Sequence, residues 1–231
     1  MLLDLYDTLV SFDPRLIAAG RAATAARLGV TPEALERADR ATMPDRMLGR
    51  HGGLRDELAG LLRAAGAPAG ALDVAAFMAA ELRMWEAAVV VHDDVRPALA
   101  RLRRHGVRLG LVSNCSHLTA PLLDMWGLRD RFDAVTLSCE AGCVKPSPRL
   151  FERALAAIGG EAARGLLVDD RQDCVEAARA LGFRARRIVR GAPPGEAGEV
   201  ADLGELTDEL LLGRPPLRPS ASSPAGGEGS S

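Results

Sequence analysis

The first ten residues place an acid directly after a short apolar segment, and no other stretch constrains the fold as strongly. Residues 1–3 are all apolar and lead directly into Asp4. Asp7 and Thr8 come shortly after it, and residues 9–10 are again apolar. Burying a carboxylate costs several kcal/mol unless it is paired, hydrogen-bonded or bound to a metal. In α/β folds, ligands bind where the carboxyl ends of parallel strands meet. The segment therefore indicates either a functional acid at a sheet edge or a surface turn whose Asp-Thr pair caps a helix.

Short apolar segments alternate with helical patterns in the second half of the chain. The segments predicted to be strands are residues 107–112, 132–138, 165–168 and 183–189, the last of these being the final strand. The helices predicted between and before them begin at Asp94 as an N-cap, at Pro121, at Ser147-Pro148 and at Val175. This alternation predicts an α/β fold in which helices cover both faces of a parallel sheet.

Residues 14–90 contain no strand pattern and are predicted to be helical throughout. One helix spans residues 14–28 and ends at Gly29, and the next begins with Thr31 as N-cap and Pro32 in the first turn. Residues 42–53 should interrupt the helical pattern, because they contain Pro44 and three glycines. Two further helices are expected at about residues 54–65 and 72–88.

These patterns divide the chain into three parts. Residues 1–13 and 91–212 are expected to form an α/β core, and residues 14–90 a helical domain inserted after the first strand. Residues 213–231 are rich in Pro, Ser and Gly and lack periodicity, so we expect a disordered tail.

Composition excludes several classes of partner. The net charge of −2 argues against binding to nucleic acid or to a membrane surface, and no apolar run approaches the roughly 20 residues of a membrane span. The N-terminus lacks a basic segment followed by an apolar one, so a cytoplasmic location with reduced thiols is expected. Cys139 and Cys143 have no nearby ligands that would complete a zinc site.

Polar residues follow the predicted strands at positions that a parallel sheet would bring to one edge. They are Asp4 to Thr8, Ser113-Asn114, Lys145 and Asp169-Asp170. A carboxylate can act as a nucleophile, a hydroxyl and an ammonium group can hold an anion, and clustered acids can bind Mg²⁺. Taken singly, each has a simpler explanation: a helix N-cap for the Ser-Asn pair, a solvated side chain for the lysine, and a turn for the acidic pair. Their occurrence together in this order favours a shared site.

The set resembles the motifs of the haloacid dehalogenase-like (HAD) hydrolase superfamily over about residues 1–190. Asp4-Leu-Tyr6-Asp-Thr8 matches the first motif, Asp-x-Asp-x-Thr, and Ser113 at the end of an apolar strand matches the second. Lys145-Pro146 matches the third, and Asp169-Asp170 before a helix rich in small residues matches the fourth. The resemblance implies a Rossmann-like core with an α-helical cap formed by residues 14–90.

The resemblance also implies roles for these residues. Asp4 would be the covalent nucleophile, with Tyr6 and Lys145 as further catalytic residues. The substrate would be a small anion, bound by Thr8, Ser113, Asn114 and Lys145. A Mg²⁺ cofactor would be held by Asp4, the backbone carbonyl of Tyr6, Asp169 and Asp170.

Tyr6 departs from the pattern of the family's phosphatases, which usually have a second Asp there to protonate the leaving oxygen. A phenol with a pKa near 10 is a poor acid at neutral pH. Tyr at this position is similar to the metal-independent 2-haloacid dehalogenases, whose halide leaving group needs no proton. That branch has Ser and Asn at the fourth motif, however, where this chain has Asp169-Asp170. Cys174 also stands where many relatives have Asp or Asn.

Three functions follow in order of preference. The first is a Mg²⁺-dependent phosphatase of a small phosphorylated metabolite, the second a metal-independent 2-haloacid dehalogenase, and the third a catalytically weak binding module. Arg46, Arg50 and His51 can either reach the site from the cap and bind an anionic substrate or form a solvated loop. A monomer and a homodimer are both compatible with the sequence.

Overall fold

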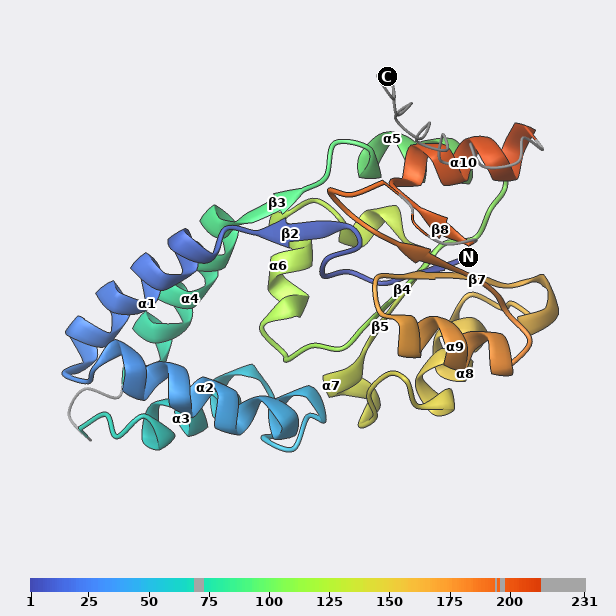
Figure 1. Cartoon of the computed structure of the whole chain (residues 1–231). Helices are drawn as coiled ribbons and strands as arrows, with labels where there is room; N and C mark the ends of the chain where they lie inside the picture. Colours follow the sequence, from blue (N-terminus) through green and yellow to red (C-terminus); the bar gives the residue numbers. More distant parts are fainter. Residues whose placement is uncertain (69–72, 194, 196–197, 213–231) are drawn as a thin grey trace, which may run out of the picture.

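The computed structural model describes residues 1–68, 73–193, 195 and 198–212, so the tail predicted at residues 213–231 lies outside the described part. Its core is a six-stranded sheet in the order β5-β4-β1-β6-β7-β8, with every neighbouring pair parallel (Figure 1). The strands are β1 (Leu2–Leu3), β4 (Gly110–Ser113), β5 (Ala134–Leu137), β6 (Leu166–Asp169), β7 (Arg184–Ile188) and β8 (Glu199–Val200).

Neighbouring residues of the central strands point to opposite faces of the sheet and create two apolar layers. Leu3 and Leu111 belong to one buried cluster, whereas Leu2 and Val112 belong to the other, as the two-residue period of a strand requires. The helices that cover the first face are α5 (Val95–Arg104), α6 (Thr119–Met125) and α10 (Leu203–Leu212), and those on the second face are α8 (Pro148–Ala157) and α9 (Gln172–Ala180). The predicted α/β class, with helices on both faces of a parallel sheet, is confirmed.

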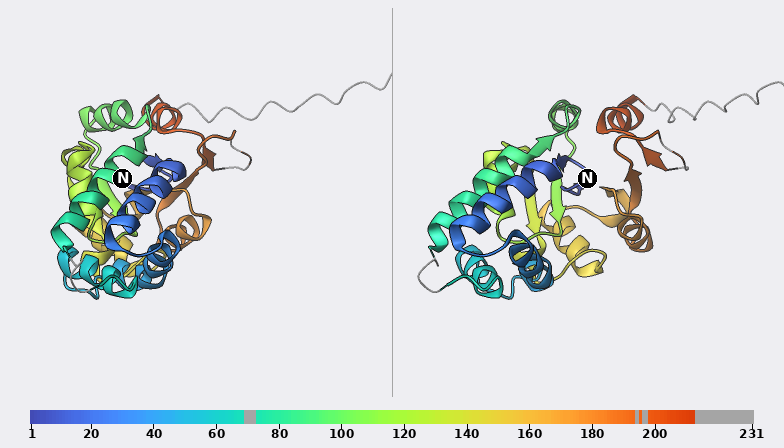
Figure 2. Two further views of the ribbon diagram at one scale, coloured as in Figure 1. Left: turned by 90° about the vertical axis from the view of Figure 1, so that its left-hand side faces the viewer. Right: turned by 60° about the vertical axis from the view of Figure 1, so that its left-hand side comes forward.

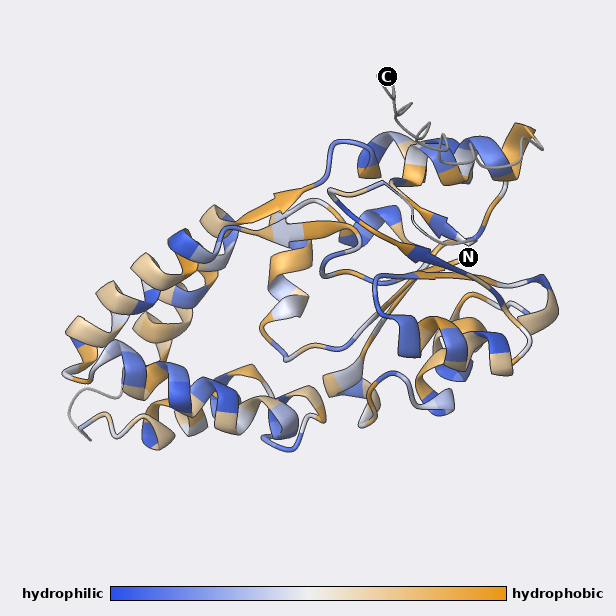
Figure 3. Ribbon diagram, in the orientation of Figure 1, coloured by the Kyte–Doolittle hydropathy of each residue, from blue (hydrophilic) through white to orange (hydrophobic). Residues whose placement is uncertain are grey.

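In the described part of residues 14–88, four α-helices lie beside the sheet and have their own apolar cluster. They are α1 (Pro14–Leu28), α2 (Pro32–Met47), α3 (Leu54–Ala64) and α4 (Val74–Ala88). Figures 1 and 2 show α1 packed along α4 and α2 along α3. Leu35, Leu58 and Phe77 are buried between them, and Figure 3 shows hydrophobic and hydrophilic residues interspersed along these helices.

A short antiparallel ribbon connects these four helices to the core. It pairs β2 (Val10–Phe12) with β3 (Val89–Val91), and Phe12 lies opposite Val89. The prediction that residues 14–90 contain no strand is therefore wrong at its last two residues. Three consecutive valines favour the extended conformation, but they follow an uninterrupted helical pattern that concealed the strand.

Helix ends agree with the sequence at α1 and at the start of α2, but not at the end of α2. The Thr31 hydroxyl accepts a hydrogen bond from the backbone N–H of Ala34 at 3.2 Å, which is the predicted N-cap. The predicted interruption at residues 42–53 is partly wrong, because α2 continues through Pro44 to Met47. The Thr42 hydroxyl donates to the carbonyl of Ala38 at 2.8 Å within this part of the helix.

The end of α2 docks against α7 (Ser138–Ala141), the short helix after β5. Gly49 has a φ of +67°, and a Cβ atom there would lie 1.9 Å from the carbonyl oxygen of Cys139. Only glycine permits this close approach, so Gly49 determines how near the four helices come to the sheet edge.

Other elements differ from the sequence predictions. Strand β7 is not the last, because β8 and α10 follow it. Lys145 does not directly follow a strand, since α7 separates it from β5. Two short 3₁₀ helices, Arg129–Arg131 and Ala162–Arg164, complete the described elements. Within the described ranges, no helix has both the length and the apolar character needed to cross a membrane.

Candidate active site

Asp4 lies immediately after β1, between the ends of β4 and β6. Its backbone N–H continues the sheet by donating to the carbonyl of Val168 at 3.0 Å, and its side chain is buried. The buried Thr8 hydroxyl donates to Asp4 Oδ2 at 3.5 Å. Burial raises the pKa of the Asp4 carboxyl, while the charge of Lys145 acts in the opposite direction.

Lys145 joins two of the predicted acids. Its buried ammonium group donates to Asp4 Oδ1 at 2.5 Å and to Asp169 Oδ2 at 2.6 Å. These carboxylates raise the pKa of Lys145 above its ordinary value despite the opposing effect of burial, so the ammonium form is favoured. The end of β6, the residue after β1 and the loop after α7 thus place two carboxylates on one cation.

Asn114 holds the backbone of Lys145 in place. Its amide nitrogen donates to the carbonyl of Lys145 at 2.9 Å, and its amide oxygen accepts from the N–H of Lys145 at 2.7 Å. Asn114 was predicted to bind substrate, but this contact uses both polar ends of its side chain. We therefore assign it a positioning role.

Ser113 ends β4 with a hydroxyl that is fully buried. Among the described residues, its Oγ has no hydrogen-bond partner. An unpaired buried hydroxyl is unfavourable by roughly 1–3 kcal/mol. Such an orphaned group beside Asn114 and Lys145 is free to hold an oxygen of a bound anion.

Asp170 completes a group of three acids that can hold a metal ion. One oxygen from each of Asp4, Asp169 and Asp170 lies within 4.8 Å of the others. Burial first, and then the charge of the neighbouring acid, raises the pKa of both Asp169 and Asp170. Crowded carboxylates that resist ionisation suit a hard divalent cation such as Mg²⁺, which prefers oxygen ligands. We call Asp4, Lys145, Asp169 and Asp170 the strand-end cluster.

A turn at residues 7–9 follows Asp4. Asp7 adopts a left-handed conformation with a φ of +58°, and its side chain is exposed. The next carbonyl, that of Thr8, accepts from Arg190 Nε at 3.0 Å and from its terminal nitrogen at 2.7 Å. Arg190 in turn binds the carboxylate of Asp94. The prediction that Asp94 caps α5 is therefore wrong, because its side chain makes no cap hydrogen bond. It helps to anchor the turn through Arg190 instead.

Tyr6 points away from the acids towards α6. Its hydroxyl shares a hydrogen bond of 2.9 Å with the hydroxyl of Thr119. Burial raises the pKa of the Tyr6 phenol above its ordinary value of 10.0. The phenol therefore stays protonated at neutral pH and is a weaker acid than a solvated tyrosine.

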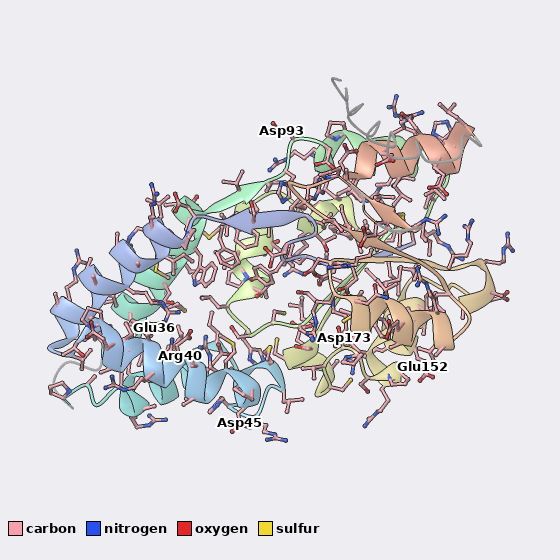
Figure 4. The ribbon with its side chains drawn as sticks, in the orientation of Figure 1. Glu36, Arg40, Asp45, Asp93, Glu152 and Asp173 are labelled. Atoms are coloured by element: carbon pink, nitrogen blue, oxygen red, sulfur yellow. The ribbon has the colours of Figure 1, made fainter. Side chains whose placement is uncertain are left out.

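A cavity of about 200 Å³ lies beside Tyr6 and Asn114, between helices α1, α2 and α4 on one side and the loop after β4 and α6 on the other. Tyr6 and Asn114 line it on the core side, and Arg46 lines it from α2. Of the three residues Arg46, Arg50 and His51 considered from the sequence, Arg46 alone lines this cavity. Arg50 instead pairs with the exposed Asp45, labelled at the outer side of α2 in Figure 4, and His51 lies beside Gly60.

The sequence matches known proteins in a consistent way. A model of the haloacid dehalogenase-like hydrolases matches residues 1–182. The "Phosphatase MT3486" of Mycobacterium tuberculosis is 37% identical over 117 residues, which cover 50% of this chain and 54% of that protein. The phosphoserine phosphatase of Thermus thermophilus is 34% identical over 155 residues, which cover 65% of this chain and 61% of that protein. The chain thus spans little more than half the length of these relatives.

A solved structure of the L-2-haloacid dehalogenase RSc1362 superposes with a TM-score of 0.60 at 26% identity, covering 90% of this chain and 96% of that one. Proteins named as phosphatases therefore share part of this sequence, and a protein named as a dehalogenase shares this fold.

Proposed function

The chain belongs to the haloacid dehalogenase-like hydrolase family, and from this membership we propose that it is a Mg²⁺-dependent phosphohydrolase with Asp4 as its nucleophile. The observation behind this assignment is the composition of the strand-end cluster. Three carboxylates face a single ammonium group, so a divalent cation is needed to balance them before an anionic substrate can approach.

The proposed reaction has two steps at one phosphorus atom. An oxygen of Asp4 attacks the phosphoryl group, the bond to the leaving oxygen breaks, and an aspartyl phosphate forms on Asp4. Water then attacks the same phosphorus, releases inorganic phosphate and restores the carboxylate. Lys145 and the unpaired Ser113 hydroxyl hold phosphoryl oxygens and offset their charge.

Mg²⁺ would be held by Asp4, Asp170 and the backbone carbonyl of Tyr6, with Asp169 close by, and would supply positive charge against the phosphoryl oxygens. Residues 14–90 are proposed to act as the cap, because α1, α2 and α4 line the adjoining cavity. The substrate is proposed to be a small phosphate ester or acyl phosphate.

Tyr6 limits which esters are hydrolysed well. Its raised pKa leaves the site without an acid at the usual position, and the absence of general acid catalysis costs about 10²–10⁴-fold. We therefore expect aryl phosphates and acyl phosphates, whose leaving groups depart without a proton, to be preferred over alkyl phosphates.

The test uses 4-nitrophenyl phosphate and acetyl phosphate, with Mg²⁺ and with EDTA. Turnover that requires Mg²⁺ and is lost in the Asp4→Asn variant is expected. Turnover of these esters that persists in EDTA would contradict the proposed role of the metal.

A metal-independent 2-haloacid dehalogenase is the second candidate. Tyr6 favours it, as does the 26% identity to the L-2-haloacid dehalogenase. Asp169 and Asp170 weigh against it, because a metal-independent displacement of halide does not require a pair of metal-binding carboxylates beside Asp4. Release of chloride from 2-chloropropionate in EDTA, without phosphatase activity, would establish this alternative.

A further inference from the structure

We propose that the cavity beside the strand-end cluster accepts an uncharged leaving group and excludes substrates that carry a second anionic group. This inference rests on the proposed phosphohydrolase function and specifies its substrate class. It comes from four charged side chains, Arg21, Asp39, Arg46 and Glu57, which we call the arginine cluster.

The walls of the cavity are mostly apolar. Its volume of about 200 Å³ lies below the 300–1,000 Å³ typical of sites for larger ligands. The apolar side chains that line it are Tyr6, Phe12, Met43, Met47, Trp85, Leu118 and Leu122. A small leaving group with an apolar or aromatic body fits this surface.

Arg46 enters the cavity with its hydrogen-bonding capacity already committed. Nε donates to Glu57 Oε1 at 2.9 Å, and one terminal nitrogen donates to Asp39 Oδ1 at 2.5 Å. The other terminal nitrogen lies 3.5 Å from the hydroxyl of Ser116. Because the Arg46 and Glu57 side chains are 3% and 0% exposed, water does little to weaken this pair.

Arg21 is the second cation of the cavity, and it shares a partner with Arg46. Its terminal nitrogen lies 3.0 Å from Asp39 Oδ2. Asp39 thus uses one oxygen for each arginine. Among the described residues that line the cavity, these two arginines are the cations, and each already has a carboxylate partner.

Two further contacts stop the cluster from releasing an arginine to a substrate. The second oxygen of Glu57 accepts from the backbone N–H and from Nδ1 of His117, both at 3.0 Å, which fixes Glu57 against Arg46. A third acid, Glu81, also lines the cavity and is buried. Burial raises the pKa of Glu81, which favours its neutral form as a hydrogen-bonding group.

The charge of the cavity therefore sums to zero or less before a substrate binds. A carboxylate on the leaving group would have to displace Asp39 or Glu57 from an arginine and leave that acid buried without its partner, which is strongly unfavourable. A leaving group with an amide, a hydroxyl or an aromatic ring can bind without displacing either acid from its arginine. The balanced arginines thus act against anionic substrates.

Two esters of the same shape test this directly, 4-carbamoylphenyl phosphate and 4-carboxyphenyl phosphate. With wild-type protein and Mg²⁺, we expect kcat/KM for the amide to exceed that for the carboxylate by at least about tenfold. Equal values, or a preference for the carboxylate, would overturn the inference.

The Asp39→Asn variant removes one negative charge and frees positive charge in the cavity. We expect the ratio of the two kcat/KM values to move towards the carboxylate by about tenfold relative to wild type. Differences in leaving-group chemistry cancel in this comparison. Asp39→Glu keeps the charge and should keep the wild-type preference, and Asp45→Asn removes a charge from the exposed side of the same helix and should not change it. An unchanged ratio in a folded Asp39→Asn protein would contradict the inference.

Failure of the inference and failure of the proposed function give different results. Hydrolysis of 4-nitrophenyl phosphate with a preference for the carboxylate ester would overturn only the substrate class. Absence of Mg²⁺-dependent hydrolysis of every ester and of acetyl phosphate would overturn the phosphohydrolase assignment and this inference with it. If Asp39→Asn does not fold, the wild-type ratio still decides.

Discussion

The strand-end cluster and the arginine cluster are both buried and charged, but they differ in balance. The first contains three carboxylates and one ammonium group, which pairs with two of them. In the second, two carboxylates face two guanidinium groups. Tyr6 connects them: it follows Asp4 of the first cluster by two residues, and it lines the same cavity as Arg21, Asp39 and Arg46 of the second.

This difference in charge balance indicates that the strand-end cluster requires a bound cation, whereas the charges of the arginine cluster already neutralise one another. Excess negative charge in a buried place is tolerated when a cation binds, so the strand-end cluster is suited to bind a metal and then a phosphate. In the arginine cluster, each arginine pairs with a carboxylate of the same cluster, so no ligand is needed to balance its charge. Its role is to determine the shape and charge of the cavity, not to attract the substrate.

The largest expected effect comes from removing the proposed nucleophile. Asp4→Asn should lower kcat/KM for 4-nitrophenyl phosphate by about 10⁴-fold or more, because no covalent intermediate can form. Steady-state kinetics with Mg²⁺ measure this. The variant should remain folded by circular dichroism, and residual activity above one hundredth of wild type would contradict the role of Asp4.

Breaking the arginine cluster should affect stability more than any exposed ion pair does. Arg46→Met leaves the buried Glu57 without its arginine and leaves Asp39 with Arg21 alone, so we expect a loss of about 3–5 kcal/mol in the free energy of unfolding. Urea denaturation gives the value. The matched variant Arg50→Met, which breaks an exposed pair with Asp45, should cost at most about 1 kcal/mol. Similar losses of unfolding free energy for Arg46→Met and Arg50→Met would contradict the expected difference between the buried and the exposed ion pairs.

Mg²⁺ should stabilise the folded protein through the strand-end cluster and not through the arginine cluster. At 100 times its Kd, Mg²⁺ should add about 2.7 kcal/mol to the free energy of unfolding, and Asp170→Asn should abolish this gain. Thermal denaturation with and without Mg²⁺ provides the measurement. A full Mg²⁺ response in the variant would show that the ion binds elsewhere.

The raised pKa values of the acids in the strand-end cluster predict that the stability of the protein depends on pH. Asp4, Asp169 and Asp170 have pKa values raised in the folded state, so the folded protein binds more protons than the unfolded chain. Without metal, the contribution of these acids to stability should fall as pH rises above about 4, the usual pKa of Asp, through their raised values. Asp170→Asn should reduce this fall, as measured by urea denaturation over a pH series. A steeper fall in the variant would contradict the assignment.

The smallest expected change is a gain of activity at Tyr6. Tyr6→Asp would supply an acid where the family's phosphatases usually have one, and should raise kcat for alkyl phosphates by about 10²-fold at most. Aryl phosphates should respond less, because their leaving groups need no proton. An equal gain for both classes of ester would point to a cause other than proton donation.

Much of the strand-end cluster could be predicted from the sequence. Short apolar segments that end in polar residues specify a parallel sheet, and the geometry of such a sheet brings Asp4, Ser113 and Asp169 to one edge. Lys145 was placed correctly near this edge although α7 precedes it, because the loop from α7 to α8 returns to the same place.

The arginine cluster could not be predicted in the same way. Glu57 lies 11 residues after Arg46 and on another helix, so their pairing depends on how α2 packs against α3. A partial signal was available, since Asp39 and Arg46 are seven residues apart and two helical turns bring them to one face. The assumed break near Pro44 concealed it. The left-handed Asp7 was also missed, because an alternating pattern cannot reveal a single turn residue.

The ribbon formed by β2 and β3 has a consequence for how this protein can diversify. Because Phe12 lies opposite Val89, the chain leaves the core and returns to it at neighbouring positions. Everything between these two residues can be exchanged by recombination, or shortened to a hairpin turn, without changing the order of the sheet. If these residues act as the proposed cap, one such exchange would change the walls of the cavity and leave the strand ends intact.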